Sequence, residues 1–187
     1  MPAEKDPVEN RASVRPSTWY HAILTTYGAW LYGDARGFRT RHHREHIDGD
    51  YRNPPPSGEY TSLEQRSRDA LKQDPVVLPT SLRRVVGLAL RDRLVELGGL
   101  VACLAVGGQH VHVLAKMPRG GARHYLGKAK RHAWFVLRQS GWSGRLWGKR
   151  SKALLIRDRA HQLKVYHYIL RHRREEAWVW SCAQGEL

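Results

Sequence analysis

Two histidines separated by one apolar residue are the most chemically suggestive feature of the sequence. On a β-strand, His110 and His112 project from one face while Val111 and Val113 project from the other. Two neighbouring neutral imidazoles can bind a divalent cation, and a ligand from elsewhere in the chain usually completes such a site. The alternative is that both are ordinary surface histidines in a chain that contains 11 of them. Their place in an apolar hairpin, directly after a Gly-Gly pair at 107–108, favours a function.

A second group of reactive side chains lies near the C-terminus. Tyr168 and His172 are four residues apart, so a helix places them on the same face, one turn from each other. Tyr166 is the alternative reactive tyrosine, and it lies about 200° around the helix from Tyr168. A stripe of tyrosine and leucine on a last helix is commonly packing against a sheet, and this interpretation suits Leu163, Tyr166 and Leu170 better than Tyr168.

The elements that must position these residues follow from hydrophobic periodicity and turn signals. The expected order is strand, helix, strand, strand, helix, strand, helix, with strands at 19–26, 100–106, 109–116 and 153–156, and helices at 82–97, 123–139 and from a cap at Asp158 to about Arg171. A β-α-β-β-α-β order is the ferredoxin-like pattern, an antiparallel sheet with two helices on one face. The sequence therefore predicts an α+β, ferredoxin-like fold with an extra C-terminal helix.

The length of 187 residues suits one domain. We expect a flexible tail at 1–17, a single domain at 18–180 with a polar insertion at about 38–75, and a tail at 181–187; within the insertion, 62–71 is expected to form a short helix. The sequence contains no secretory signal and no apolar run long enough to span a membrane. Its two cysteines are too few for a disulfide framework, so a cytoplasmic location is expected.

The charge balance favours a polyanionic partner. The chain has 32 Lys and Arg against 17 Asp and Glu, a net charge of +15, which points to nucleic acid first and to an anionic membrane surface second. Seven tryptophans and eight tyrosines accompany the charge, and unpaired bases stack on such rings. The residues predicted to bind DNA are basic residues on and around the second domain helix: Arg119, Arg123, Lys128, Lys130, Arg131, Lys149, Arg150 and Lys152.

Taken together, these motifs resemble those of the HUH single-tyrosine transposase family, which includes the transposases of the smallest insertion sequences and the REP-associated tyrosine transposases. The resemblance rests on the His-Val-His run at 110–112, the Leu-Trp-Gly run at 146–148 and the Tyr-Ile pair at 168–169. It extends from about Trp19 to Trp178 and is weakest across the insertion. The Tyr-Gly-x-Trp-Leu-x-Gly-Asp-x-Arg-Gly run at residues 27 to 37 is similar to a divergent branch of these proteins.

The resemblance implies an activity and a set of residue roles. Tyr168 would be the nucleophile, and His110, His112 and His172 would bind a divalent metal, Mg²⁺ or Mn²⁺. The implied reaction is metal-dependent nicking and rejoining of single-stranded DNA through a 5′-phosphotyrosine intermediate, at sites flanked by hairpins. Members of the family include monomers and homodimers, so the resemblance leaves the oligomeric state open.

The sequence departs from the family pattern at the third ligand. His172 stands where the family has Gln or Asn, and the Asn-Pro that follows the family's tyrosine helix is replaced by Arg-His-Arg-Arg at 171–174. A site of three histidines tolerates Mn²⁺ or Zn²⁺ better than Mg²⁺. Two alternatives follow: a rebuilt active site, or a domesticated non-catalytic nucleic-acid-binding protein on the same scaffold. A ferredoxin-like RNA-binding protein of unrelated ancestry is a third.

Overall fold

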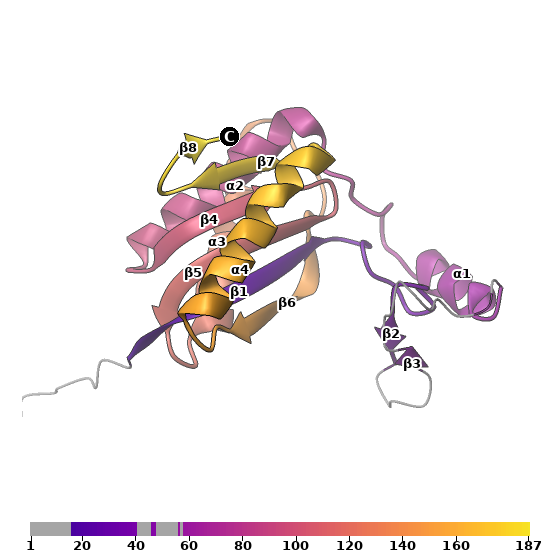
Figure 1. Ribbon diagram of the computed structural model, residues 1–187. Coiled ribbons are helices and arrows are strands. Elements are labelled where there is room, and N and C mark those ends of the chain that lie inside the picture. The colour runs from indigo at the N-terminus through magenta and orange to yellow at the C-terminus, as the bar shows by residue number, and fades with distance from the viewer. Residues whose placement is uncertain (1–15, 41–45, 48–55, 57) are drawn as a thin grey trace, which may run out of the picture.

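A six-stranded antiparallel sheet forms the centre of the protein, whose computed structural model describes residues 16–40, 46–47, 56 and 58–187 (Figure 1). The strand order is β6-β1-β5-β4-β7-β8. The strands are β1 (Ser17–Thr26), β4 (Leu100–Val106), β5 (His110–Pro118), β6 (Trp147–Leu155), β7 (Trp178–Ser181) and β8 (Gly185–Glu186). The fold is therefore α+β with an antiparallel sheet, as predicted. Of the tail expected at 1–17, residues 1–15 lie outside the described residues, and Ser17 already belongs to β1.

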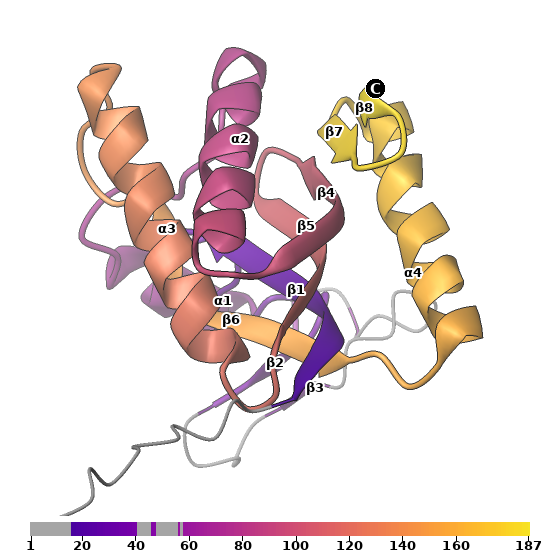
Figure 2. The same ribbon diagram turned by 90° about the vertical axis from the view of Figure 1, so that its left-hand side faces the viewer.

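Helices cover both faces of this sheet. Figure 2 shows α2 (Thr80–Glu96) and α3 (Ala122–Gln139) on one side and α4 (Arg159–Arg171) on the other. A 3-10 turn, η1 (His172–Glu175), continues α4. Asp158 caps α4 as expected, because its carboxylate accepts a hydrogen bond from the His161 backbone N–H at 2.7 Å.

The two faces have separate apolar cores, and the period-two alternation of β5 contributes to both. Val111 and Val113 belong to the core beneath α2 and α3, whereas Leu114 belongs to the core beneath α4. Since residues two apart share a face, His110 and His112 lie on the α4 side of β5. An inner strand and a covering helix thus bring the two sequence motifs to the same place.

Two predictions about the sheet edges are wrong. The strand expected at 153–156 is the long edge strand β6, which begins at Trp147. Its charged residues face solvent, as on many edge strands, and break the apolar pattern that would have marked it. Residues 181–187 are not a tail, because β8 pairs with β7 and Arg84 forms a 2.8 Å ion pair with Glu186. Gly185, at a φ of 74°, allows the tight turn between these two strands.

The insertion forms a small unit beside the sheet. It contains β2 (Phe38–Arg39), β3 (His46–Ile47) and α1 (Thr61–Asp69), which confirms the short helix expected at 62–71. The loop before β2 packs directly on α1: a Cβ at Gly33 would lie 2.4 Å from the Glu64 backbone nitrogen, so only glycine fits there. In the part of the chain that the structure describes, no helix is both long and apolar enough to cross a membrane.

Candidate metal centre

Three histidines meet between β5 and the end of α4. His110, His112 and His172 each offer one ring nitrogen, and these three atoms lie within 4.8 Å of one another. The rings of His112 and His172 are stacked, with centroids 4.7 Å apart, and the His110 ring lies 5.0 Å from His112. This histidine cluster could hold one divalent metal ion, because neutral imidazoles are common ligands of transition metals.

The outer nitrogens of two of these rings have protein partners. His172 Nδ1 lies 2.8 Å from a carboxylate oxygen of Glu175, and His112 Nδ1 lies 3.0 Å from Nε2 of His21 on β1. A metal-bound imidazole almost always donates its other N–H to such an acceptor, which fixes the tautomer and the ring orientation. Glu175 and His21 therefore leave Nε2 of His172 and of His112 as the nitrogens for a ligand.

The Nε2 atom of His172 is the clearest sign that something belongs in the cluster. It is buried and has no hydrogen-bond partner among the described residues. A buried polar atom without a partner costs about 1–3 kcal/mol, so such atoms are rare in stable proteins. Occupation of the cluster by a cation would satisfy this nitrogen, and the donor set therefore fits a metal ion.

The surroundings of His110 and His112 favour their neutral form. Burial, together with the charges that His172 and His110 would carry, lowers the pKa of His112 to about 2. Burial also lowers the pKa of His110, and it lowers the pKa of His21 to about 4. Since only a neutral imidazole has a free lone pair, these residues are ready for a metal at neutral pH.

Tyr168 lies against the cluster from one turn earlier on α4. Its ring centroid is 4.9 Å from that of His172 and 5.4 Å from that of His112, with edge-to-face geometry in both cases. The side chain is 40% exposed, so the phenol is reachable from solvent. Burial and the nearby Glu175 carboxylate raise its pKa, so the phenol is protonated unless a cation or base assists it. The alternative tyrosine, Tyr166, packs partly buried against the core beneath α4.

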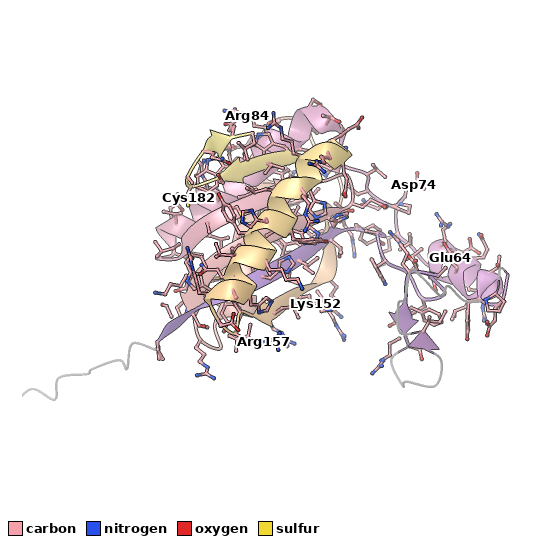
Figure 3. The ribbon with its side chains drawn as sticks, viewed as in Figure 1. Glu64, Asp74, Arg84, Lys152, Arg157 and Cys182 are labelled. Carbon is pink, nitrogen blue, oxygen red and sulfur yellow. The ribbon has the colours of Figure 1, made fainter. Side chains whose placement is uncertain are left out.

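A cationic hollow opens beside Tyr168. It has a volume of about 530 Å³, and His21, Arg157, Lys164 and Arg171 contribute to its wall. Figure 3 shows Arg157 at the foot of α4, near Lys152 of β6. The one carboxylate in this wall belongs to Asp158, which is engaged as the cap of α4. An anionic group placed in the hollow would lie next to the phenol and among positive charges.

The residues predicted to bind DNA belong to two elements, and some residues of each line a common hollow. Arg119, Arg123, Lys128 and Arg131 are exposed on α3 and the turn before it, while Lys149, Arg150 and Lys152 are exposed on β6. Lys130 differs, since it is buried and donates a 2.7 Å hydrogen bond to the Gly148 carbonyl oxygen. Because α3 covers the opposite face of the sheet from α4, its basic residues do not lie beside the histidine cluster.

Sequence reasoning missed the residues that support and surround the cluster. His21 was detectable only with the pairing of β1 and β5, which sets His21 opposite Leu114 and beside His112. Glu175 follows His172 by three residues, so the helical spacing offered a signal for it. Arg157, Lys164 and Arg171 are ordinary surface cations in the sequence, and only the fold gathers them at Tyr168.

Comparison of the chain with models of known protein families, with curated proteins and with solved structures finds no match.

Proposed function

We propose that this protein is a metal-dependent enzyme of the HUH single-tyrosine type, which nicks and rejoins single-stranded DNA through Tyr168. The observation that carries the proposal is the contact of the Tyr168 ring with His112 and His172, two members of the only histidine cluster of this kind among the described residues. A phenol beside a candidate metal centre, at the edge of a cationic hollow, suits attack on a phosphodiester.

The arrangement of the strands supports the same interpretation. Within the sheet, β6-β1-β5-β4 is the order expected when a β-α-β-β-α-β unit folds with two helices on one face, and α2 and α3 provide those helices. We interpret this part as ferredoxin-like, with α4 added on the other face and β7 and β8 extending the sheet.

In the proposed reaction, the Tyr168 oxygen forms a bond to phosphorus as the bond from phosphorus to the 3′ oxygen breaks. The phenol loses its proton and the departing 3′ oxygen gains one, which leaves a 5′-phosphotyrosine and a free 3′-hydroxyl. Reversal with a new 3′-hydroxyl rejoins the strand, because the phosphotyrosine keeps the energy of the original bond. Arg157, Lys164 and Arg171 would hold the phosphate beside the phenol.

His110, His112 and His172 would hold the metal, which would supply charge stabilisation at the phosphate. Three imidazoles suit Mn²⁺ or Zn²⁺ better than Mg²⁺, which prefers oxygen ligands. We therefore propose Mn²⁺ ahead of Mg²⁺ as the activating ion.

The test is capture of DNA by the nucleophile. Labelled hairpin-flanked single-stranded DNA would be incubated with the full chain and Mn²⁺ or Mg²⁺, then resolved on a denaturing gel. The expected result is a labelled band of protein size that EDTA abolishes. Tyr168→Phe should abolish the band while DNA binding is kept, and Tyr166→Phe, the matched control two residues away, should retain it.

An adduct that persists in Tyr168→Phe would assign the chemistry to another residue. If the wild-type protein binds the DNA but forms no adduct in either metal, the enzymatic proposal is wrong. The protein would then be better described as a non-catalytic nucleic-acid-binding protein on this scaffold.

A further inference from the structure

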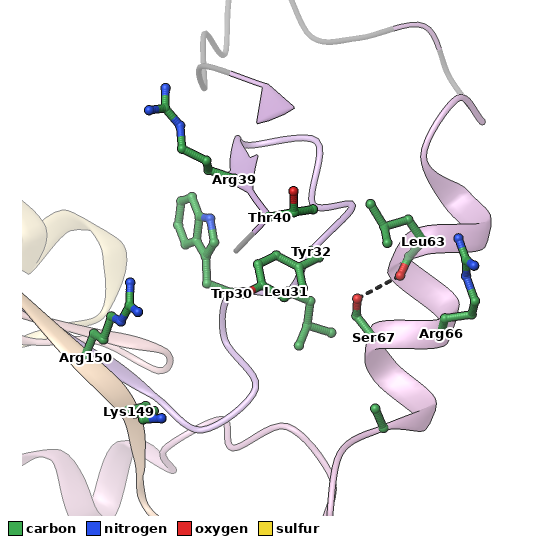
Figure 4. Close-up of a pocket in the computed structure, with 11 residues that line it drawn as sticks. Trp30, Leu31, Tyr32, Arg39, Thr40, Leu63, Arg66, Ser67, Lys149 and Arg150 are labelled. Carbon is green, nitrogen blue, oxygen red and sulfur yellow. Dashed lines mark hydrogen bonds between the residues drawn. The ribbon is translucent and has the colours of Figure 1, made fainter. Parts of the chain in front are cut away.

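An open groove of about 1180 Å³ lies between the loop after β1, the helix α1 and the beginning of β6 (Figure 4). Two aromatic rings, Trp30 and Tyr32, contribute to its wall, together with the basic residues Arg39, Arg66, Lys149 and Arg150. No carboxylate is among the described residues that line it. We call it the aromatic groove. Its composition is that of a surface for single-stranded nucleic acid, where rings stack on bases and cations follow the backbone.

Trp30 is held as a fixed platform in this groove. Its indole N–H donates to the Gly37 carbonyl oxygen, and the Arg36 guanidinium lies 4.6 Å from the ring centroid. Arg36 is in turn fixed by an ion pair with Asp34. Despite these contacts the Trp30 side chain is 52% exposed. A large apolar ring that is both immobilised and exposed loses little conformational entropy when a partner stacks on it.

The basic wall of the aromatic groove continues onto the next surface. Lys149 and Arg150 also line a neighbouring hollow of about 450 Å³, which they share with Arg123 and Lys130 of α3. Both hollows share Lys149 and Arg150 of β6, so cations lie along a path from the aromatic groove to α3 (Figure 4 shows these two residues at the groove). A path of this kind suits several successive phosphates better than a single small anion.

The loop that forms one wall of the groove leaves the sheet next to the first histidine of the cluster. Thr25 of β1 pairs with His110 of β5, and the loop that carries Trp30 leaves the sheet directly after Thr26. The Thr26 backbone N–H donates to the Gln109 carbonyl oxygen at 2.9 Å. The loop that carries Trp30 therefore begins close to His110, at the end of the sheet.

We propose that the aromatic groove binds an unpaired segment of single-stranded DNA, with one base stacked on Trp30 and backbone phosphates against Lys149 and Arg150. The choice of DNA as the polyanion rests on the proposed function, whereas the evidence for a nucleic-acid-binding groove comes from its lining residues. This gives a role to the run at 27–37 and to the insertion, which carry no part of the tyrosine chemistry.

Binding is tested without the chemistry, using full-length Tyr168→Phe protein in EDTA. Fluorescence anisotropy would measure its affinity for an unstructured oligodeoxythymidine and for an abasic strand of equal length. Trp30→Ala should weaken binding of the oligodeoxythymidine by roughly 5- to 160-fold, because stacking of one base is worth about 1–3 kcal/mol. Binding of the abasic strand, which has nothing to stack, should change little.

Matched variants separate stacking from folding. Trp30→Phe keeps an aromatic face and should retain most of the affinity. Trp180→Leu alters another indole that lies beneath an arginine, Arg91, at the far side of the sheet, and should bind normally. The double change of Lys149→Gln and Arg150→Gln should weaken the binding of both DNA strands. It should also reduce the slope of log affinity against log salt concentration by about 1.4, because each lost phosphate contact contributes about 0.7.

Unchanged affinity of a folded Trp30→Ala protein for oligodeoxythymidine would overturn the inference. Equal losses for the abasic strand would also overturn it, because the effect would not be stacking. The assay needs neither metal nor Tyr168, so a wild-type protein that never forms a covalent adduct leaves this result intact. Conversely, the Trp30→Ala change could be made in a protein that retains Tyr168. If that protein forms the adduct normally and binds oligodeoxythymidine with unchanged affinity, DNA binding in the groove is rejected while the proposed nuclease activity stands.

Discussion

The partners of the imidazole rings distinguish the histidine cluster from a chance gathering of histidines. His172 and His112 each use Nδ1 for a protein partner, Glu175 and His21 respectively, and each has Nε2 left for a ligand. Surface histidines have no need of such matched orientation, whereas metal-bound histidines are usually held in this way. If a metal binds the cluster, Glu175 would be a positioning residue that acts on it through His172.

A change at Glu175 tests this role. Glu175→Gln should weaken Mn²⁺ binding by about 10- to 100-fold, because loss of an outer partner of a ligating histidine typically has an effect of that size. Titration calorimetry of the metal-free protein with MnCl₂ would measure it. The adjacent exposed carboxylate offers a matched control, and Glu176→Gln should bind Mn²⁺ as the wild type does. Equal affinities for both variants would show that Glu175 does not position a ligand.

Spacing identified the two pairs of residues at the centre of the cluster, because local geometry fixes each pair, whereas the family resemblance assigned both pairs to one site. Two residues along a strand, or four along a helix, share a face whatever the rest of the fold does. His110, His112, Tyr168 and His172 were predictable for this reason. His21 was not predictable, because it contacts His112, 91 residues later in the chain, only when β1 pairs with β5.

At the scale of elements, α4 carries the proposed nucleophile Tyr168 and leads directly into η1 with the candidate ligand His172, so the N-terminal cap of α4 affects both. Asp158→Ala should reduce the free energy of unfolding by about 1 kcal/mol, because it leaves the His161 backbone N–H without its acceptor. Denaturant unfolding followed by circular dichroism would measure the change. Asp158→Asn should recover most of the loss, and the exposed Asp74→Ala should have little effect. A full loss in the Asn variant would contradict a capping role.

Elements with strong apolar periodicity were predictable, and the edges of the sheet were not. The inner strand β4 and the helix α2 appeared where the sequence placed them, within one or two residues. The predicted strand at 153–156 was shorter than β6, because Lys149, Arg150 and Lys152 face solvent at the edge of the sheet and interrupt the apolar pattern. β7 and β8 were missed because four and two residues are too few to establish a period. Such strands are fixed by their neighbours, in this case β4 and the Arg84–Glu186 pair.

At the scale of the whole molecule, one sheet separates two cores with different neighbours. The core beneath α2 and α3 is the larger, and the smaller core beneath α4 contains Cys103, Leu114 and Ile169. Burial raises the pKa of the Cys103 thiol to about 12. The thiol therefore remains protonated and unreactive while α4 covers it.

This shift predicts how stability depends on alkaline pH. Above the ordinary thiol pKa of 9.0, the unfolded chain loses the Cys103 proton while the folded chain keeps it up to about 12. The folded state then binds more protons, so stability should fall as pH rises from about 9 toward 12. Chemical unfolding at a series of pH values would measure the slope. Cys103→Ala should reduce it, and an unchanged slope in that variant would contradict the assignment.

The same burial predicts which cysteine reacts with alkylating reagents. Cys182 is exposed and should be modified by iodoacetamide in the folded protein, whereas Cys103 should react only when α4 leaves the sheet. Mass spectrometry of peptides after timed alkylation would distinguish them. Equal rates at the two cysteines would show that the core beneath α4 opens readily.

The placement of Tyr168 and His172 on consecutive turns of one helical segment has a thermodynamic consequence. In a protein that works as proposed, a cation held by His172 and a phosphate held beside Tyr168 both favour the same docked position of α4. Thermodynamic linkage then requires reciprocity. If the bound cation increases the affinity for DNA by some factor, bound DNA increases the affinity for the cation by the same factor. Cation and DNA would be cooperative ligands of a single conformational equilibrium, with α4 as the element that couples them.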